Sequence, residues 1–473
     1  MIEGLKPYAE YKESGQPWNG AVPAHWSVHK AGQIGRLLKG SGGSKADNVD
    51  EGVPCVRYGQ LYTKYRGFIY EPKSFIRPSQ AVQYTAIRYG DVLFAASGEK
   101  VDEIGKSAVN LMRIDAVCGG DVIILRPRID VCPPFLGYAL DSYASAGQKA
   151  TMCRGSTIKH IYPDELRLLA VSLPPPDEQA AIVRFLDHAN RKIDGFIRAK
   201  RKLIGLLNEQ KQAIIHRAVT RGLDPEVPLK PSGIPWLGDI PKHWGTPRLA
   251  QLSTRIGDGL HGTPEYVDQS PYHFINGNNL VNGCIRLKAS TRCVGLAEFK
   301  KHAVPLGEST LLMSINGTIG SVALYRGESV ILGKSAAYIN CNKSLTREYL
   351  LCFLQSPAVV NFLRQEVTGT TIFNLSLASI RGLPIALPSV DEQLSIVGSI
   401  EKNTAPTSTA IARTEREIAL MQEYRTRLTA DLVTGKLDVC EAAAKLPDLP
   451  TDAAAEPLTD EAPDDTETEE IEA

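Results

Sequence analysis

Hydrophobic residues recur at helical spacing in two stretches of the chain that share a sequence. The first runs from Asp177 to Asp224 and begins DEQAAIV, and the second runs from Asp391 to Asp438 and begins DEQLSIV. An acidic pair suits a helix start, because free N–H groups and the helix dipole favour negative charge there. The two copies are offset by 214 residues, which is too long a period for a solenoid. The repeat therefore indicates two copies of a domain-plus-helix unit.

We expect each repeated stretch to break once. Pro406 lies inside the second copy and cannot continue a helix from the preceding turn, and its equivalent in the first copy is Lys192, shortly before Gly195. The pattern therefore predicts a short helix followed by a longer one, over residues 193–220 and 407–434. At ~1.5 Å per residue, the longer helix spans roughly 42 Å.

The longer helices have the hydrophobic spacing of a coiled coil. One a position of the heptad is charged in each copy, Lys211 and Arg425, and a single polar seam residue can fix register at some cost in stability. The apolar a and d positions are Ile197, Ile204, Leu207 and Ile214 in the first copy and Ile411, Ile418, Met421 and Leu428 in the second.

The segments between the repeats predict two globular domains of mixed α/β (α+β) class. Short apolar runs bounded by Gly, Asp and Asn are typical of strands, and longer apolar segments are typical of helices. The predicted strands are residues 92–96, 122–125, 310–315 and 321–325, and the predicted helices are residues 133–142 and 347–363. The predicted order is a first domain (1–173), a first helical region (174–224), a second domain (225–387), a second helical region (388–439) and a tail (440–473).

All four tryptophans lie in two similar segments, one near the start of each domain. Residues 11–26 read YKESGQPWNGAVPAHW, and residues 229–244 read LKPSGIPWLGDIPKHW. We favour the interpretation that each Trp pair anchors an irregular segment onto its domain, because buried aromatic side chains with polar handles commonly do this. Stacking of the Trp rings on nucleic-acid bases is the alternative.

The formal net charge of zero conceals an uneven distribution. From Glu441 to the end, 12 acidic residues and one lysine give −11, so the rest of the chain carries +11. A basic body suits a polyanionic partner, and the acidic tail is predicted to be disordered. The nine cysteines form no C-x-x-C pair, and no stretch is apolar enough to span a membrane, so we expect a reduced, cytoplasmic protein.

Catalytic and metal-binding motifs fail on spacing. The runs at 105–107 and 333–335 both read GKS, but each lacks a glycine at the distance that a phosphate-binding loop needs, so we interpret them as turns. His25 and His29 have helical spacing, yet the second copy has Pro247 where the first has His29, which disfavours a paired metal site. We therefore expect no catalytic residue and no metal site, and a binding protein.

The Trp segments and the DEQ helices together resemble the specificity subunit of type I DNA restriction-modification systems. Residues 256–266, IGDGLHGTPEY, are also similar to the opening of a target recognition domain in that family. The resemblance covers nearly all of residues 5–439, and the acidic tail departs from the family pattern.

The resemblance implies a scaffold without catalytic residues or a cofactor of its own. Two target recognition domains each read one half of a bipartite site on double-stranded DNA, and the helices form an antiparallel coiled coil that sets their spacing. A separation of ~42 Å corresponds to about twelve base pairs. Two methyltransferase subunits carry S-adenosylmethionine, and motor-nuclease subunits use ATP and Mg. The alternatives are a structural coiled-coil adaptor and a stand-alone methyltransferase or nuclease.

Candidate DNA contacts are basic and amide side chains in loop-like segments of the domains. Arg and Lys bond guanine edges and phosphates, and Asn has the chemistry to read adenine. In the first domain the candidates are Lys39, Lys45, Arg57, Lys64, Arg66, Lys100, Arg154 and Lys159. In the second domain they are Arg255, His261, Asn276, Asn278, Asn279, Lys288, Arg292, Lys300, Lys301 and Lys334.

Overall fold

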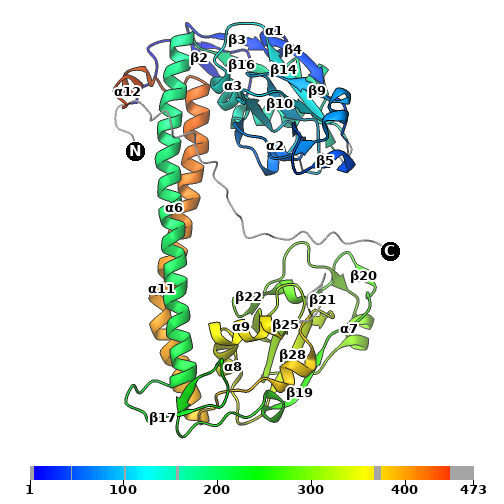
Figure 1. Cartoon of the computed structure of the whole chain (residues 1–473), viewed down its shortest axis with the longest axis vertical. Helices are drawn as coiled ribbons and strands as arrows, with labels where there is room; N and C mark the ends of the chain where they lie inside the picture. The colour runs from blue at the N-terminus through cyan, green and yellow to red at the C-terminus, as the bar shows by residue number, and fades with distance from the viewer. Residues whose placement is uncertain (1–4, 44, 101–102, 156–158, 367–373, 448–473) are drawn as a thin grey trace. The chain divides into compact units, whose positions relative to one another are not determined.

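The computed structural model describes residues 5–43, 45–100, 103–155, 159–366 and 374–447. The chain divides into two compact units, and each long helix contributes to both. Unit 1 comprises the described residues of Met1–Ala199 and Glu417–Ala473, and unit 2 comprises those of Lys200–Arg416. Figure 1 shows both units, each with its own sheets and short helices.

Unit 1 is built on two five-stranded sheets. The first, called the main sheet because its strands are longer, has the order β4-β14-β10-β12-β7 and is antiparallel except between β12 and β7. The second has the order β5-β8-β6-β13-β9. The strands of the first sheet are β4 (Gly35–Lys39), β14 (Val122–Pro127), β10 (Val92–Ala95), β12 (Ser107–Asn110) and β7 (Gly67–Ile69). Those of the second are β5 (Asn48–Val49), β8 (Phe75–Ile76), β6 (Val53–Val56), β13 (Ala116–Cys118) and β9 (Thr85–Ile87).

Short strand pairs and helices complete unit 1. The strand pairs are β1 (Tyr11–Glu13) with β2 (Ala21–Pro23), β3 (Ser27–Lys30) with β16 (Ala170–Leu173), and β11 (Ser97–Gly98) with β15 (Lys159–His160). The helices are α1 (Ala31–Ile34), α2 (Gln60–Thr63), α3 (Pro133–Leu140), α4 (Tyr143–Met152), α5 (Pro163–Leu166) and α12 (Cys440–Ala444), with 3-10 turns η1 (Lys45–Asp47) and η2 (Pro78–Gln83). Helix α3 packs on β12 and β7, and its Phe135 is fully buried.

Unit 2 is also built on two sheets with additional short strand pairs, but each of its two sheets has four strands. Its sheets have the orders β19-β28-β25-β26, β20-β24-β21-β27 and β22-β23, with the separate pair β17-β18. The strands are β17 (Leu229–Pro231), β18 (Asp239–Pro241), β19 (Ser253–Asp258), β20 (Tyr266–Val267), β21 (His273–Ile275), β22 (Leu280–Val281), β23 (Cys284–Ile285), β24 (Cys293–Val294), β25 (Thr310–Ser314), β26 (Val322–Leu324), β27 (Val330–Leu332) and β28 (Ala336–Cys341).

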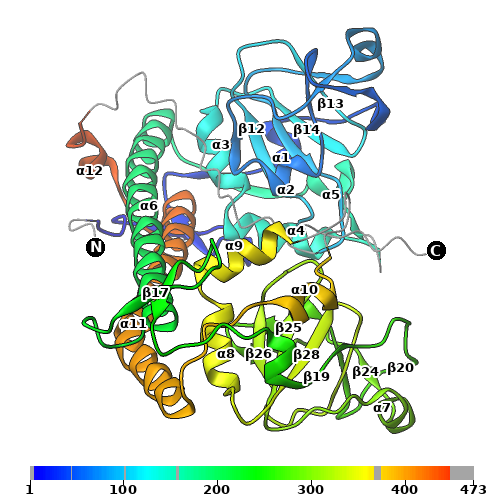
Figure 2. The same cartoon turned by 60° about the horizontal axis from the view of Figure 1, so that its bottom comes forward.

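Helices of unit 2 pack on both of its four-stranded sheets. They are α7 (Leu296–His302), α8 (Arg347–Leu354), α9 (Pro357–Gln365) and α10 (Leu377–Gly382), with 3-10 turns η3 (Leu249–Leu252) and η4 (Gly277–Asn279). Figure 2 shows α8 beside β25 and β26, and α10 near β19. The predicted strands at 92–96, 122–125, 310–315 and 321–325 are confirmed, and the predicted helix at 347–363 divides into α8 and α9 just before Pro357.

The predicted break in each repeated stretch is wrong. Helix α6 runs continuously over Pro176–Arg221, and α11 runs over Val390–Val433 with Pro406 inside it. Proline removes the N–H that would bond the carbonyl of Lys402. Both residues are exposed, so water can bond that carbonyl, which makes an unbroken helix tolerable. Each helix also begins one residue before the predicted aspartate cap.

Segments of the two long helices pack side by side within each unit. In unit 1, Asp194 of α6 forms an ion pair with Arg425 of α11, and Ile182 shares a core with Leu432. Residue numbers rise along one helix as they fall along the other, so the segments are antiparallel. Every apolar seam residue predicted from the heptads is buried or half-buried.

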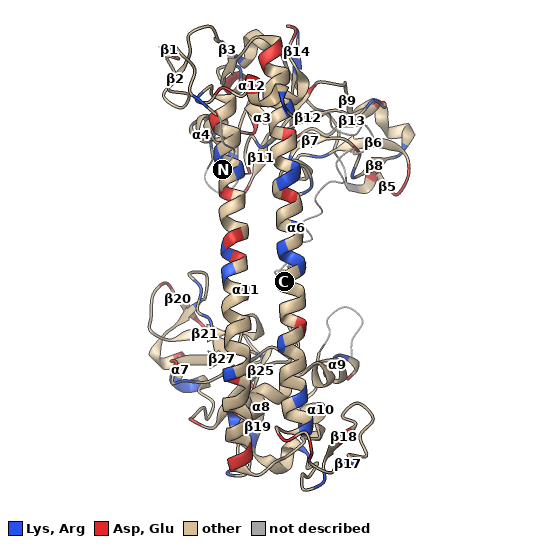
Figure 3. Ribbon diagram, turned by 90° about the vertical axis from the view of Figure 1, so that its left-hand side faces the viewer, with Lys and Arg blue, Asp and Glu red and all other residues tan. Residues whose placement is uncertain are grey.

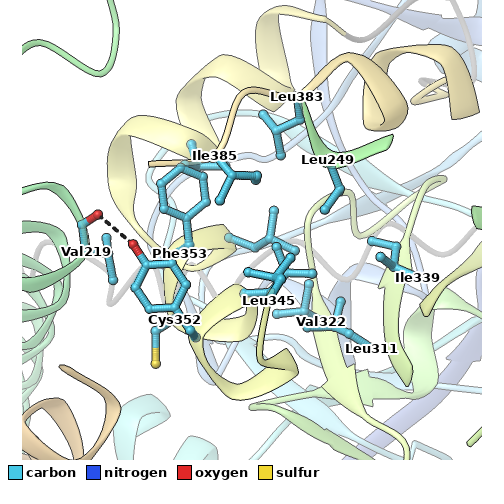
Figure 4. Close-up of a cluster of buried hydrophobic side chains, with 14 of the residues drawn as sticks. Val219, Leu249, Leu311, Val322, Ile339, Leu345, Cys352, Phe353, Leu383 and Ile385 are labelled. Carbon is cyan, nitrogen blue, oxygen red and sulfur yellow. Dashed lines mark hydrogen bonds between the residues drawn. The ribbon is translucent and has the colours of Figure 1, made fainter. Parts of the chain in front are cut away.

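The same antiparallel packing recurs in unit 2. Val219 of α6 shares a core with Ile396 of α11 and with the main sheet of the unit. Figure 4 shows this core, with Val219 accepting a hydrogen bond through its carbonyl. The donor is the buried hydroxyl of Tyr349 in α8, at 3.2 Å. The helix end is therefore fixed to the domain by both apolar and polar contacts.

The start of the predicted disordered tail is ordered. Residues 440–444 form α12, and Val439 and Ala443, four residues apart, bury their side chains in the core of unit 1. The carbonyl of Leu446 accepts a hydrogen bond from Arg184 of α6. The rest of the predicted tail, residues 448–473, lies outside the described residues.

Candidate functional site

The glutamate of the first DEQ motif anchors the Trp segment of unit 1. Glu178 accepts hydrogen bonds from Trp26 Nε1 at 2.9 Å and from the Tyr8 hydroxyl at 3.1 Å, and His25 Nε2 lies 2.6 Å from its other oxygen. Burial, reinforced by the nearby Glu178 carboxylate, raises the pKa of Tyr8, so its hydroxyl stays protonated and donates. The Trp26 side chain is fully buried.

Unit 2 repeats the anchor with equivalent residues. Glu392 accepts from Trp244 Nε1 at 3.1 Å, and His243 Nε2 lies 3.1 Å from its second oxygen. Trp244 is 1% exposed. Buried indoles cannot stack on bases, so for Trp26 and Trp244 the structure supports anchoring over base stacking.

The other two tryptophans pack on their own domains. Trp18 lies over Gly147 of α4 so closely that a Cβ there would meet the indole ring at 2.6 Å. Trp236 stacks on Phe362 of α9, with ring centroids 5.0 Å apart. Each Trp segment therefore joins the body of a domain to the start of a long helix.

The glutamine of the DEQ motif joins the same helix to a second element of the domain. Gln179 Oε1 accepts from the backbone N–H of Cys132, the N-cap of α3, and its amide donates to the carbonyl of Pro174. In unit 2, Gln393 accepts from the N–H of Thr346, the N-cap of α8, and donates to the carbonyl of Pro388. Both glutamines are buried, so each helix start is fixed to its domain through matched contacts.

The sequence analysis assigned the DEQ acids to the free N–H groups and the dipole of the helix start, and it missed these partners. The available signal was that the His-Trp pair and the DEQ motif repeat together, at offsets of 218 and 214 residues. Two motifs that recur as a set, about 150 residues apart in each copy, are candidates for a direct contact.

Three predicted DNA contacts of unit 1 lie around one short strand pair. Lys159 is on β15, opposite Gly98 of β11, and Lys100 follows β11. Arg154 bridges to His160 through the backbone, and its guanidinium pairs with Glu165 at 2.7 Å. Lys100 pairs with Glu103 at 3.8 Å, so two of these three cations already have an acidic neighbour.

The remaining candidates of unit 1 lie on or beside elements other than β11 and β15. Lys39 ends β4, Lys45 opens η1, and Lys64 and Arg66 follow α2, with Lys39, Lys64 and Arg66 exposed. Arg57 is different, because it is half-buried and donates to Asn48 at 2.6 Å. Its guanidinium also lies 5.7 Å from the centre of the Tyr84 ring, so Arg57 is held inside its own domain.

In unit 2 the structure brings several candidates together around η4. Asn276 accepts from Ser335, next to Lys334, at 3.0 Å. Asn279 donates to Thr291, next to Arg292, at 3.4 Å and to the Arg286 carbonyl at 3.0 Å. Asn279 is 8% exposed and already hydrogen-bonded, so it supports the fold rather than presenting its amide to a base.

The other candidates of unit 2 differ in exposure and in whether the side chain already has a partner. Asn278, Lys288, Lys300 and Lys334 are exposed, while Arg292 lies 4.7 Å over the Tyr266 ring and Lys301 pairs with Glu298 at 3.2 Å. His261 pairs with Asp258 at 2.7 Å at the end of β19. Arg255, on β19, is exposed and lines a hollow of about 700 Å³ together with Arg381.

Figure 3 shows that Lys and Arg positions are also spread along α6. Among the described residues, no group of three or more His, Cys, Asp or Glu side chains could hold a metal ion. Within the same ranges, no helix combines the length and the apolar character that crossing a membrane requires.

A family model for the type I restriction modification DNA specificity domain matches residues 23–203 and 260–419. The EcoKI specificity subunit of Escherichia coli (strain K12) is 20% identical over 463 residues, covering 91% of this chain and 93% of that protein. The StySPI specificity subunit of Salmonella potsdam is 21% identical, with the same two coverages. A chain from a solved structure on assembly and conformational transition of the type I R-M system aligns at TM-score 0.61 and 17% identity, covering 87% of this chain and 98% of that chain. The chain therefore belongs to the type I restriction-modification DNA specificity family.

Proposed function

We propose that this chain is the DNA sequence-recognition subunit of a type I restriction-modification complex and carries no catalytic residue itself. Each of its two globular domains reads one half of a bipartite site on double-stranded DNA. The match of the specificity-domain family to both halves of the chain carries this proposal. The matched anchors at Glu178 and Glu392 support it, because they hold two different domain surfaces on one repeated helical frame.

The long helices set the spacing between the half-sites, as an antiparallel coiled coil. The antiparallel segments in each unit and the buried seam residues support this arrangement. Because α6 and α11 are unbroken, the ~42 Å estimate, which assumed a break, no longer fixes the number of base pairs between the half-sites.

The partners supply the chemistry. Two methyltransferase subunits dock on the scaffold and use S-adenosylmethionine to methylate an adenine in each half-site, and motor-nuclease subunits with ATP and Mg cleave unmodified DNA. The exposed charged faces of α6 and α11 offer the docking surface.

Methylation mapping tests the function. The chain is co-expressed with its methyltransferase subunit in a host without adenine methylation, and methylated adenines are read across the genome. One bipartite motif with a constant gap is the expected result. A soluble complex that leaves the genome unmethylated would contradict the proposal.

A domain exchange tests the division of labour. Residues 254–350 are replaced by the corresponding segment of another specificity subunit, which leaves the anchors and long helices in place. We expect one half-site of the mapped motif to change and the other to persist. If both halves persist, residues 254–350 do not read DNA.

A further inference from the structure

Unit 1 has a basic hollow that none of the predicted contacts includes. The hollow has a volume of about 580 Å³ and lies at one end of the main sheet, beside β4 and β14. Its charged lining residues are Arg36, Arg88, Arg126, Arg128 and Asp91. Arg36 on the edge strand β4 is paired directly with Arg126 on β14.

The register of the sheet explains why charge gathers there. Across β10, β14 and β4, one row of neighbouring side chains belongs to a buried apolar cluster: Leu93, Ile124 and Leu38. Two residues further along the strands, on the same face, the row is charged: Asp91, Arg126 and Arg36. Side chains two residues apart share a face, so the hollow opens where the apolar core ends.

The one carboxylate among these lining residues, that of Asp91, already accepts several hydrogen bonds. Arg126 donates to Asp91 through Nε at 2.9 Å and through Nη2 at 2.7 Å. The backbone N–H of Arg88 donates to the same carboxylate at 2.8 Å. Asp91 is 1% exposed, so it neutralises Arg126 and leaves the other guanidinium groups without an acid.

Three arginines of the lining have no acidic partner among the described residues. Arg36, Arg88 and Arg128 are exposed, and their side chains have no partner in the described parts of the chain. Asp91 neutralises Arg126, so the excess positive charge of the hollow lies on the other three arginines. A bound anion would balance this excess charge and accept hydrogen bonds from the three guanidinium groups in place of water.

Unit 2 places an arginine at the corresponding point of its own sheet. The neighbouring row there is Thr310, Asn340 and Arg255, on β25, β28 and β19. Thr310 donates to Asn340 at 2.7 Å, in the place of the Asp91–Arg126 pair, while Arg255 occupies the edge position of Arg36. The repeated fold therefore presents an edge-strand arginine beside a hollow in both units, with more positive charge in unit 1.

We propose that the hollow of unit 1 binds phosphate groups of the DNA backbone next to the half-site that this unit reads. The inference rests on the proposed function and names residues within it. Guanidinium forks match phosphate geometry, and exposed arginines at a rim suit a strand that passes over the surface. Such contacts fix the position of the duplex without reading its sequence.

The test uses the complex of this chain with its methyltransferase subunit and two duplexes, one with the mapped motif and one scrambled. Arg36→Gln, Arg88→Gln and Arg128→Gln are made singly and together, and the dissociation constant is measured against salt concentration. Each phosphate contact contributes roughly 0.9 to the slope of log K against log salt. We expect the magnitude of this negative slope to fall by about 2–3 in the triple variant and by up to about 1 in each single variant.

Specificity and folding provide the controls. The triple variant should lose affinity for both duplexes by similar factors, while the methylated motif stays the same. Lys12→Gln, which removes an exposed cation on β1 of the same unit, should leave the slope unchanged. Arg126 is kept, since its loss would leave Asp91 buried and unpaired. If the triple variant does not fold, the single variants decide, because single Arg→Gln changes at exposed positions rarely disturb folding.

Three results would overturn the inference and leave the proposed function standing. The first is an unchanged salt slope in folded variants. The second is loss of the methyltransferase subunit from the complex, which would assign the hollow to an acidic protein surface. The third is an altered motif, which would mean base reading. Failure of the unmodified complex to prefer its motif duplex would instead overturn the proposed function itself.

Discussion

Removal of the Glu178 carboxylate should destabilise unit 1 more than the equivalent change destabilises unit 2. In Glu178→Ala the buried indole N–H of Trp26 loses its acceptor, and the hydroxyl of Tyr8 loses its own. A buried donor left unpaired costs about 1–3 kcal/mol, and a hydrogen bond to a charged group contributes about 1.5–3 kcal/mol. The contact with His25, whose side chain is 47% exposed, adds little.

The expected loss in unfolding free energy for Glu178→Ala is therefore about 3–4 kcal/mol. For Glu392→Ala we expect about 2 kcal/mol, because Glu392 has only Trp244 and His243 as described donors and is itself more exposed, at 28% against 15%. Glu178→Gln keeps one acceptor oxygen and should lose about 1–2 kcal/mol.

Hydrogen exchange resolves the two units. Amides in the first turns of α6 report opening around Glu178, and those in the first turns of α11 report opening around Glu392. Asp177→Ala is the matched control, because it removes an exposed first-turn charge next to Glu178 and should cost less than about 1 kcal/mol. Equal losses for Glu178→Ala and Asp177→Ala would refute the anchoring argument, as would a larger loss for Glu392→Ala.

Three further changes have definite signs. Burial lowers the pKa of Lys149 to about 8 from its usual 10.5. Between those values the unfolded chain binds a proton that the folded chain does not, so stability should rise with pH, and Lys149→Met should remove that rise in urea unfolding compared with the wild type. Arg425→Ala leaves Asp194 without its ion-pair partner between the helices and should lower the free energy of unfolding by about 1–3 kcal/mol. An unchanged stability in thermal unfolding would disprove the contact. Ser356→Ala should be neutral or stabilise by about 1 kcal/mol, unlike most N-cap changes, because its buried hydroxyl has no hydrogen-bond partner among the described residues. A clear loss of stability in urea unfolding would contradict this.

Local pattern predicted the elements of this fold well and their interruptions poorly. Apolar runs such as residues 310–315 identify strands because burial on both faces requires continuous hydrophobic sequence. Pro406 misled the helix prediction, because the cost of a missing N–H depends on whether water reaches the freed carbonyl. Sequence alone does not state that exposure.

Candidate site residues were harder to predict, since a side chain's freedom depends on partners distant in sequence. Asn279 has the right chemistry for a base contact, yet its amide bonds Arg286 and Thr291. Arg36 and Arg126 become neighbours only when β4 pairs with β14, and 90 positions separate them along the chain. No local pattern marks such a pair as one site.

The repeat separates what the two units share from what distinguishes them. The shared contacts are those of Glu178 and Glu392, which fix a long helix to its domain by the same chemistry in each unit. Equivalent strand rows of the two domains carry different side chains, an Asp91–Arg126 pair in one sheet and Thr310 with Asn340 in the other. Since the anchors do not involve these rows, the surface of one domain can change without disturbing how its helices are held. A domain exchange that leaves the anchors intact should therefore alter one DNA half-site alone.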